Sequence, residues 1–316
     1  MADLIGKVKR KTRRTLNQRH SYDYPETAQG WKKVGNGPLI SGQNGSVFDP
    51  FVSRVGSRYC MCLSHRASGS LVMYDSDDGV RWENPRAILT GASRSVWEKK
   101  VNRASFVVRN GKWYLWYTGQ NSSGSAIGLA VSEDGINFRR VSDHPVLTPE
   151  LAVEAGSVMN PCVICDEKSG RFRMWYAAGE TYEPDVIMYA ESEDGIHWKK
   201  HPKPVMKADP SAAYQRYKVG ACDVAVLPDG TLLMAYIAYQ NLDVARICVA
   251  ASEDGIRWKL SAANPVISPG KGRWDSDAVY KPAIEVCEDD KIRIWYNGRQ
   301  KTTESIGLAE GRYSVL

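Results

Sequence analysis

Five short apolar segments each begin with residues that could bind or transform a polar ligand. The segments start at residues 46–50, 101–105, 158–162, 220–224 and 278–282, and they carry Asp49, Asn102, Arg103, Asn160, Asp223 and Lys281. A carboxyl group can serve as general acid, base or nucleophile, whereas an amide offers only hydrogen bonds. Asp49, Asn160 and Lys281 each precede a proline, whose fixed backbone angle can hold the neighbouring side chain at a defined angle. One such residue alone could simply cap a loop, but five in register indicate a shared site.

Other polar residues stand close enough in the sequence pattern to join this site. Glu180 follows the phrase 175–179, and Glu154, Asp275 and Asp277 are further acids that could form a pair with Asp49. His65 and Arg66 end another strand-like run and are expected nearby. The cations expected at or near the site are Arg66, Arg94, Lys99, Lys100, Arg103, Arg216, Lys218, Lys281 and Arg299. Arg forks and Lys charges suit phosphate or carboxylate groups, although ordinary solvated loop charges would give the same pattern.

A repeated phrase predicts how these residues are positioned. Ser-Glu-Asp-Gly-Ile recurs at 132–136, 192–196 and 252–256, with a looser copy at 76–80, so its glycines lie 56, 60 and 60 residues apart. A fixed period of this size is typical of repeat architectures. Each copy follows an apolar run, and an Asp-Gly pair between strands indicates a tight hairpin because Gly readily adopts positive φ. The phrase is therefore interpreted as a structural staple.

The repeats predict an all-β, five-bladed β-propeller with four antiparallel strands per blade. Each unit contains a second strand rich in aromatic residues, as in 112–117, 171–176 and 291–296. The fifth unit ends at Leu316 without a hairpin phrase, so residues 31–34 are expected to supply its outer strand and close the ring. Residues 31–316 then form the propeller and residues 1–30 an N-terminal arm. The first strand of each blade should line the central channel, and its start should lie at one mouth of that channel.

Net charge and cysteine content indicate the cellular compartment and the kinds of partner that are expected. The net charge is +6, and part of it comes from the basic segment 7–14. A solubilising tail is one reading of that segment, and peripheral contact with an anionic membrane is another. No apolar signal region or spanning run is apparent. Seven cysteines without metal-ligand spacing indicate free thiols and a cytoplasmic location. No metal, cofactor or specific nucleic-acid partner is predicted, since no phosphate loop, dinucleotide fingerprint or zinc motif is present.

The pattern resembles the five-bladed glycosidase superfamily, which includes glycoside hydrolase families 32, 43, 68, 117 and 130. The resemblance covers residues 31–316 and rests on the five units, the Trp-Tyr-x-Gly and Ser-x-Asp-Gly phrases, and the segment Phe48–Gly56. It implies that Asp49 is the general base or nucleophile. Asn160 replaces the Asp that tunes the acid in those hydrolases, and Asp223, about two positions displaced, is the nearest match to their acid.

Three functions remain open from the sequence. The first is an enzyme acting on a glycosidic bond, which normally needs two carboxyl groups, here Asp49 with Asp223 or Glu180. The second is glycosyl transfer or phosphorolysis on a phosphate-activated or acidic sugar, favoured by the cations. The third is a non-catalytic glycan-binding propeller. The residues expected to bind the carbohydrate or sugar phosphate are Asn102, Arg103, Asn160, Lys281, Asp277, His65 and Arg66.

Overall fold

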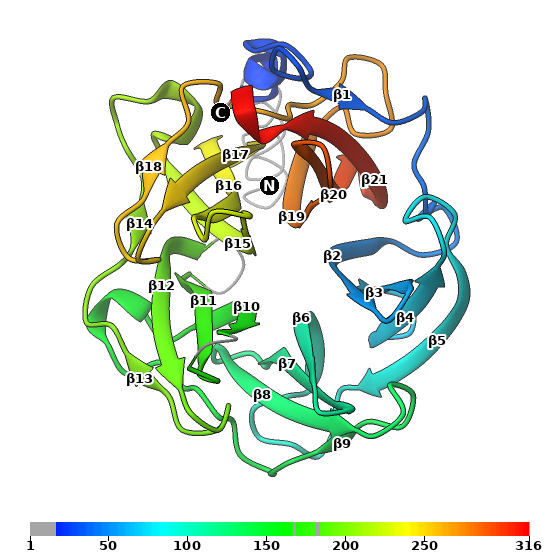
Figure 1. Cartoon of the computed structure of the whole chain (residues 1–316), viewed down its shortest axis with the longest axis vertical. Coiled ribbons are helices and arrows are strands. Elements are labelled where there is room, and N and C mark those ends of the chain that lie inside the picture. The colour runs from blue at the N-terminus through cyan, green and yellow to red at the C-terminus, as the bar shows by residue number, and fades with distance from the viewer. Residues whose placement is uncertain (1–16, 167–168, 181–183, 316) are drawn as a thin grey trace, which may run out of the picture.

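Five four-stranded antiparallel sheets form a ring in the computed structural model, which describes residues 17–166, 169–180 and 184–315. Figure 1 shows the five blades arranged around a central axis. The predicted five-bladed propeller is confirmed, as is the order of four strands in each blade. The third sheet has one addition, because β14 (Met206–Lys207) also pairs with β12.

In blades 1 to 4 the strands follow the chain in order, from the central channel to the outside of the ring. Blade 1 consists of β2 (Val47–Val55), β3 (Arg58–His65), β4 (Ser70–Ser76) and β5 (Glu83–Thr90). Blade 2 consists of β6 (Lys100–Arg109), β7 (Lys112–Gln120), β8 (Ser125–Ser132) and β9 (Arg139–Arg140). Blade 3 consists of β10 (Val158–Cys165), β11 (Phe172–Gly179), β12 (Pro184–Ser192) and β13 (Lys199–Lys200). Blade 4 consists of β15 (Lys218–Val226), β16 (Leu232–Asn241), β17 (Val244–Ser252) and β18 (Lys259–Leu260).

Blade 5 is built from both ends of the described chain. Its strands are β19 (Ala278–Val286), β20 (Lys291–Gln300), β21 (Thr303–Arg312) and β1 (Lys32–Lys33). Because β1 pairs with β21, the N-terminal strand closes the ring as predicted. Within the described residues, four short 3-10 helices complete the elements: η1 (Arg19–Tyr22), η2 (Ala152–Glu154), η3 (Ala213–Gln215) and η4 (Tyr313–Val315).

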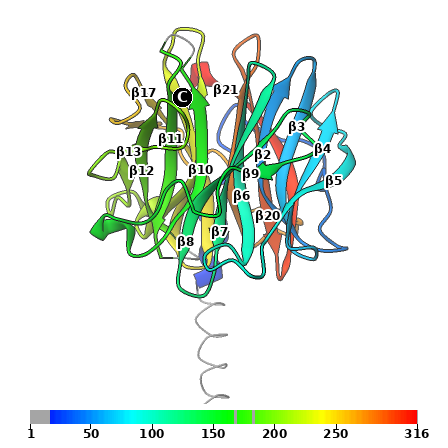
Figure 2. The same cartoon turned by 90° about the horizontal axis from the view of Figure 1, so that it is seen from below.

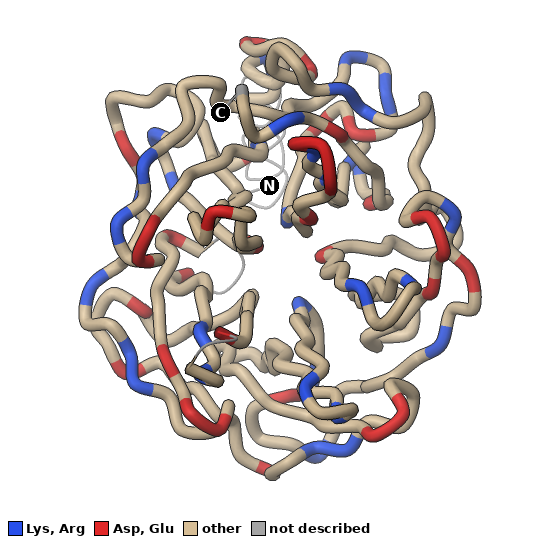
Figure 3. Tube along the Cα trace, viewed as in Figure 1, with Lys and Arg blue, Asp and Glu red and all other residues tan. Residues whose placement is uncertain are grey.

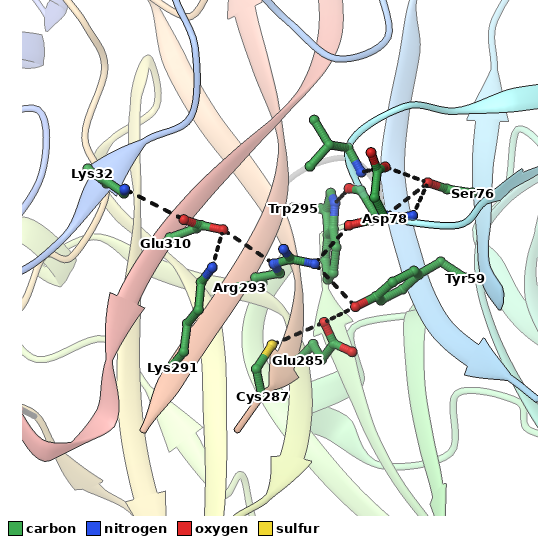
Figure 4. A network of polar contacts seen from close by, with 12 residues as sticks. Lys32, Tyr59, Ser76, Asp78, Glu285, Cys287, Lys291, Arg293, Trp295 and Glu310 are labelled. Atoms are coloured by element: carbon green, nitrogen blue, oxygen red, sulfur yellow. Dashed lines mark hydrogen bonds and ion pairs between the residues drawn. The ribbon is translucent and has the colours of Figure 1, made fainter. Parts of the chain in front are cut away.

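A polar network joins the last blade to the first (Figure 4). Arg293 of β20 donates to Glu310 of β21, to the hydroxyl oxygen of Tyr59 in blade 1 and to the carbonyl oxygen of Asp78. Nζ of Lys32 in β1 lies 3.8 Å from Oε2 of Glu310. The closure therefore links three segments that are far apart in the sequence, as a closed propeller requires.

Buried tryptophans tie neighbouring blades together. Trp116, Trp175 and Trp295 are fully buried. Each donates its indole N–H to a glycine carbonyl in the hairpin phrase of the next blade, at 2.9 Å for Gly195, 2.8 Å for Gly255 and 2.8 Å for Gly79. The two recurring phrases of the sequence are thus complementary halves of one contact between blades. This explains why both of them repeat with the same period.

The hairpin phrase is a hydrogen-bonded loop and not the tight two-residue turn that its Asp-Gly pair suggests. In blade 2 it spans residues 133–138 between β8 and β9. The Asp134 carboxylate accepts the N–H groups of Ile136 and Asn137, each at 2.8 Å, and the Ser132 hydroxyl accepts the N–H of Gly135 at 3.0 Å. Gly135 has φ of 70°, in the left-handed region as predicted. The expected role as a structural staple agrees with these bonds, although the loop is longer.

Residues 17–30 lie against blades 4 and 5. Asn17 donates to Asp243 at 2.9 Å, Gln240 donates to Asp23 at 2.9 Å, and the hydroxyl of Tyr22 donates to the carbonyl of Ser276 at 3.2 Å. The described part of the predicted arm is therefore a strap packed on the propeller, whereas the basic segment 7–14 lies outside the described residues. Within the described ranges, no helix is long and apolar enough to cross a membrane.

Candidate active site at the channel mouth

All five inner strands contain a shift in pairing register, and in four of them the residue at the shift has positive φ. The pairing register shifts at Phe48/Phe51, Asn102/Ser105, Met159/Cys162 and Tyr280/Pro282. The residues at these bulges have positive φ: 56° for Asp49, 54° for Arg103, 54° for Asn160 and 27° for Lys281. Non-glycine residues rarely adopt this conformation, and bulges re-aim side chains. In blade 4 the bulge falls at Ala221, so this blade offers no polar side chain at that position.

Three of the bulges, at Asp49, Arg103 and Asn160, are held by the blade before them. The N–H of Asp49 donates to the Asn297 side-chain oxygen at 3.3 Å, the N–H of Arg103 to the Ser64 hydroxyl at 3.0 Å, and that of Asn160 to the Thr118 hydroxyl at 3.0 Å. These bonds satisfy backbone groups that the distorted ladder leaves unpaired. Contacts between blades therefore stabilise the positive-φ backbone at these three positions. They also fix the direction of the Asp49, Arg103 and Asn160 side chains.

The side chains converge on a small pocket of about 110 Å³. Its lining residues come from all five blades: Asp49, Arg103, Asn160, Pro184, Ile237, Tyr239, Tyr280, Asn297, Arg299 and Glu304. These residues lie at the starts of first and third strands and toward the ends of second strands. We call this end of the propeller the mouth. A larger hollow of about 510 Å³ lies on the outside of blade 5, but its lining contains none of the predicted site residues.

Asp49 and Arg103 form an ion pair inside this pocket. Oδ2 of Asp49 lies 3.3 Å from Nε of Arg103, and the two side chains are only 13% and 16% exposed. Burial raises the pKa of Asp49, while the charges of Arg103 and Lys281 act in the opposite direction. A carboxyl group in such surroundings can change its protonation state at a functionally useful pH. The place predicted for Asp49 is therefore chemically suited to a reacting group.

Glu304 is a second carboxyl group in the lining. It is the second residue of β21, its side chain is 15% exposed, and its Oε2 accepts from Nη2 of Arg66 at 2.6 Å. Burial raises the pKa of Glu304, and the negative charge of Asp49 acts in the same direction, whereas Arg66 opposes both. Two carboxyl groups that feel each other across a buried pocket tend to retain one proton between them.

Asn160 adds an unsatisfied acceptor to the same lining. It is 4% exposed, and its side-chain oxygen has no hydrogen-bond partner. A buried acceptor without a donor costs free energy, so a ligand hydroxyl placed there would remove that cost.

Asp223 and Lys281 lie in the protein interior and do not line the pocket. Asp223 is 3% exposed and accepts the N–H of Ile284 in blade 5 at 2.8 Å and the thiol of Cys162 in blade 3 at 3.2 Å. Lys281 is fully buried and donates to the carbonyl of Cys222 at 3.3 Å. The geometry gives Asp223 a role in joining three blades, and its proposed role as acid stays a prediction.

The other predicted residues surround the mouth without lining the pocket. Glu180 is 62% exposed and pairs with Lys218 at 2.9 Å. Asp277 accepts the N–H of Lys301 at 2.8 Å. His65 bonds Ser68 in its own turn, and Asn102 donates to Gln120 at 3.3 Å. Arg66 reaches the site indirectly, through its ion pair with Glu304. Of the ten predicted residues, the structure thus brings Asp49, Arg103 and Asn160 together in the lining.

Glu154 and Asp275, considered as alternative acids, hold tyrosines of the second strands. Glu154 accepts the hydroxyl of Tyr176 at 2.8 Å and is bound by Lys200, while Asp275 accepts the hydroxyl of Tyr296 at 2.9 Å. Glu98 does the same for Tyr117 at 2.7 Å. Three blades thus share one buried contact between an acid and a tyrosine. These carboxylates are structural parts of the blades.

The sequence pattern does not indicate Glu304, Tyr239 or Ile237 as site residues, and it indicates no role for Tyr280 or Asn297. Tyr280 lies in the predicted segment 278–282 and Asn297 in a Trp-Tyr-x-Gly phrase, and Arg299 is one of the cations expected near the site. Glu304 lies at the start of the third strand of the fifth unit, β21. The fifth unit has no hairpin phrase from which that strand could be aligned. Glu304 lies opposite Arg299 in the pairing of β20 with β21. This pairing would have indicated Glu304 as a site residue, but it is known only once the register of the two strands is known.

Comparisons with known proteins agree with this architecture. Residues 99–219 match the model of the glycosyl hydrolases family 32 N-terminal domain. The uncharacterized protein Rv1502 of Mycobacterium tuberculosis is 31% identical over 234 residues, which cover 70% of this chain and 75% of that protein. Beta-1,2-mannobiose phosphorylase of Thermoanaerobacter sp. is 32% identical over 133 residues, covering 37% of this chain and 43% of the phosphorylase. A thermostable family-43 glycoside hydrolase structure aligns with a TM-score of 0.68 and 18% identity, covering 88% and 92% of the two chains.

Fold and comparisons together define the class as carbohydrate-active propeller enzymes. The chain belongs to the five-bladed β-propeller glycosidase superfamily, alongside glycoside hydrolase families 32, 43 and 130.

Proposed function

We propose that the mouth pocket is an active site that cleaves or transfers a glycosidic bond, with Asp49 as base or nucleophile and Glu304 as proton donor. The observation that carries this proposal is the presence of two largely buried carboxyl groups, 13% and 15% exposed, with raised pKa values in one pocket. Glycoside hydrolysis normally uses such a pair, one carboxyl group protonating the leaving oxygen and the other activating water or attacking the sugar.

The assignment of roles follows from the charges around each group. Asp49 faces the positive charges of Arg103, Lys281 and Arg66, which favour its ionised form. The pKa of Glu304 is raised both by burial and by the negative charge of Asp49. A proton shared by the pair is therefore assigned to Glu304. In the reaction, Glu304 gives its proton to the departing glycosidic oxygen. Asp49 takes a proton from the attacking water, or bonds to the anomeric carbon in a two-step reaction.

Phosphorolysis is the second candidate, and the arginines favour it. Arg103 and Arg299 line the pocket, and Arg66 contacts Glu304. Arg forks match the oxygens of phosphate, which would replace water as the attacking group, so that one protein acid suffices. The similarity to beta-1,2-mannobiose phosphorylase supports this candidate.

The test compares wild type with Asp49→Asn and Glu304→Gln on a panel of oligosaccharides, each with and without inorganic phosphate. Products are separated by anion-exchange chromatography, because a sugar phosphate and a free sugar then elute apart. Glu133→Gln, an exposed acid outside the pocket, is the matched control. Release of free sugar by wild type and the control alone supports hydrolysis, and phosphate-dependent release of a sugar phosphate supports phosphorolysis. Equal ligand binding by all four proteins without any turnover would overturn the proposal in favour of a binding module.

A further inference from the structure

The lining of the mouth pocket has a polar part and an apolar part. Figure 2 shows β2 and β6 running lengthwise between the two ends of the propeller, and near their starts these strands supply Asp49 and Arg103 to the lining. Figure 3 shows charged segments at the central ends of β2, β6 and β19. Blade 4 differs, because its bulge carries Ala221 and its lining residues are Ile237 and Tyr239. The polarity of the lining therefore changes from blade to blade.

The apolar lining residues form one continuous surface, which we call the apolar wall. It consists of Pro184 of blade 3, Ile237 and the ring of Tyr239 from β16, and the ring of Tyr280 from β19. A Cβ atom added at Gly220 would lie 3.3 Å from Cγ of Pro184, 3.3 Å from Cε2 of Tyr239 and 3.8 Å from Cδ1 of Ile237. These three side chains therefore surround one point of the β15 backbone. The Tyr280 ring adjoins them, since its centroid lies 6.3 Å from that of Tyr239.

Small apolar residues support the wall from behind. Ile237 and Tyr239 are each 4% exposed, and they pack in one cluster with Ala221, Ala245 and Ala278. The backbone of Ile237 is paired within the sheet on both sides, with β15 and with β17. Ile237 therefore offers a ligand only its aliphatic side chain, which can neither donate nor accept a hydrogen bond.

The wall faces the reacting groups across the pocket. In Figure 1, blade 4 stands across the channel from blades 1 and 2, which supply Asp49 and Arg103. A sugar bound with its reacting carbon at Asp49 therefore turns another edge toward the wall. A hydroxyl on that edge would lose its hydrogen bonds to water without gaining a partner at Ile237 or Pro184. A methyl group there would only leave water, which is favourable.

We propose that the apolar wall selects a sugar with a methyl-terminated substituent, held against Ile237 and Pro184. Two kinds of sugar have this chemistry. In a 6-deoxy sugar a methyl group replaces the terminal hydroxymethyl group, and in an N-acetylated sugar an acetamido group replaces a hydroxyl. The inference rests on the proposed function in taking the pocket as a sugar site, and it adds the class of sugar.

Isothermal titration calorimetry of the full chain with matched monosaccharides tests this selection without requiring turnover. The 6-deoxy pairs are D-fucose with D-galactose, L-fucose with L-galactose, and L-rhamnose with L-mannose. The N-acetyl pairs are N-acetylglucosamine with glucose and N-acetylgalactosamine with galactose. We expect a methyl-bearing sugar to bind about tenfold or more tightly than its partner, since a hydrophobic pocket discriminates against an added hydroxyl by up to about 10². The pair that shows the preference identifies the source of the methyl group.

Two substitutions at one position separate the polarity of the wall from its size. Val and Thr are both β-branched, but Thr carries a hydroxyl where Val carries a methyl group. Ile237→Thr should reduce the preference about tenfold, whereas Ile237→Val should retain it. Val219→Thr places a hydroxyl at a fully buried position of β15 outside the lining, and it is the matched control that should also retain the preference. Circular dichroism verifies that each variant is folded.

Binding and turnover give separate answers. Equal affinities within every pair, no binding of any of these sugars, or an undiminished preference in Ile237→Thr would overturn the proposal. The 4-nitrophenyl glycosides of the same sugars report turnover. A methyl preference in binding without any turnover would leave this inference standing and count against the proposed function. Turnover of both members of every pair at equal kcat/KM would do the reverse.

Discussion

Asp49 and Arg103 occupy the same position in consecutive blades, and their side chains meet at 3.3 Å between Oδ2 and Nε. Both residues sit at a bulge with φ near 55°, and each backbone N–H is held by a side chain of the preceding blade. A repeated local distortion thus brings opposite charges together at the channel mouth. Repetition supplies the geometry, and the change of residue type from blade to blade supplies the chemistry.

Asp49→Asn should nearly abolish turnover while leaving the fold intact. The amide keeps the shape of the side chain but can neither accept a proton usefully nor attack the sugar, and the loss of such a group typically costs about 10²–10⁴-fold in rate. Steady-state kinetics on the substrate identified in the panel gives the rate, and circular dichroism verifies folding. Turnover by a folded variant at more than about a tenth of the wild-type rate would exclude Asp49 as a reacting group.

Glu304→Gln should remove the alkaline limb of the pH–rate profile. A proton donor works only while protonated, and its raised pKa keeps it protonated above the ordinary range for Glu. Wild-type kcat/KM should therefore fall as pH rises through this raised pKa. The variant should be slower and should lack this limb. Arg66→Gln removes the partner that lowers the pKa of Glu304, so its alkaline limb should move to higher pH. An unchanged profile in both variants would contradict the proposed role of Glu304.

Much of the fold was predictable because it depends on local, repeated signals. The period of the hairpin phrase gave the blade number, and the missing outer strand of the fifth unit indicated closure by residues 31–34. The sequence also predicted three residues of the pocket lining, Asp49, Arg103 and Asn160, because each lies near the start of an inner strand at a recurring position. The loop form of the hairpin was not predicted, because the Ser and Asp side chains of the phrase replace a tight turn with their own hydrogen bonds.

The second carboxyl group was not predictable by the same reasoning. Glu304 enters the pocket because β21 pairs with β20 in a register that places it opposite Arg299. A shift by one residue would turn its side chain to the other face of the sheet. Asp223 illustrates the converse, because a carboxylate near the expected sequence position points into the contact between blades 4 and 5. Alignment to a strand start therefore locates a residue along the channel, but not the direction of its side chain.

Asp223→Ala should destabilise the protein more than it affects catalysis. The change leaves the buried N–H of Ile284 without its acceptor, which costs about 1–3 kcal/mol. Urea unfolding of the variant and wild type measures this loss, and kinetics on the folded variant measures the rate. A rate loss as large as that of Asp49→Asn with unchanged stability would instead make Asp223 the acid that its sequence position suggested.

The hairpin aspartates should make the protein sensitive to acid. Backbone N–H donors hold the pKa of Asp134 and of Asp254 well below the usual range. A lowered pKa in the folded state stabilises the fold above the unfolded-state pKa of 3.8, and this contribution disappears as pH falls toward the folded-state pKa. The double change Asp134→Asn and Asp254→Asn should therefore flatten the loss of stability between about pH 5 and pH 2. Asp77→Asn, an exposed acid in the first copy of the phrase, is the control and should leave that slope unchanged.

Asn160→Ala should weaken substrate binding more than it slows the chemical step. The unpaired side-chain oxygen of Asn160 faces the same lining as Asp49, and a sugar hydroxyl that donates to it gains a bond of about 0.5–1.5 kcal/mol. We expect KM to rise about threefold to tenfold with kcat nearly unchanged, because the bond exists both before and during the reaction. Asn102→Ala is the matched control, since Asn102 also carries an unpaired buried oxygen but lies outside the lining. Equal effects of the two changes would mean that Asn160 acts through folding and not through the ligand, while a loss confined to kcat would place its contact in the transition state.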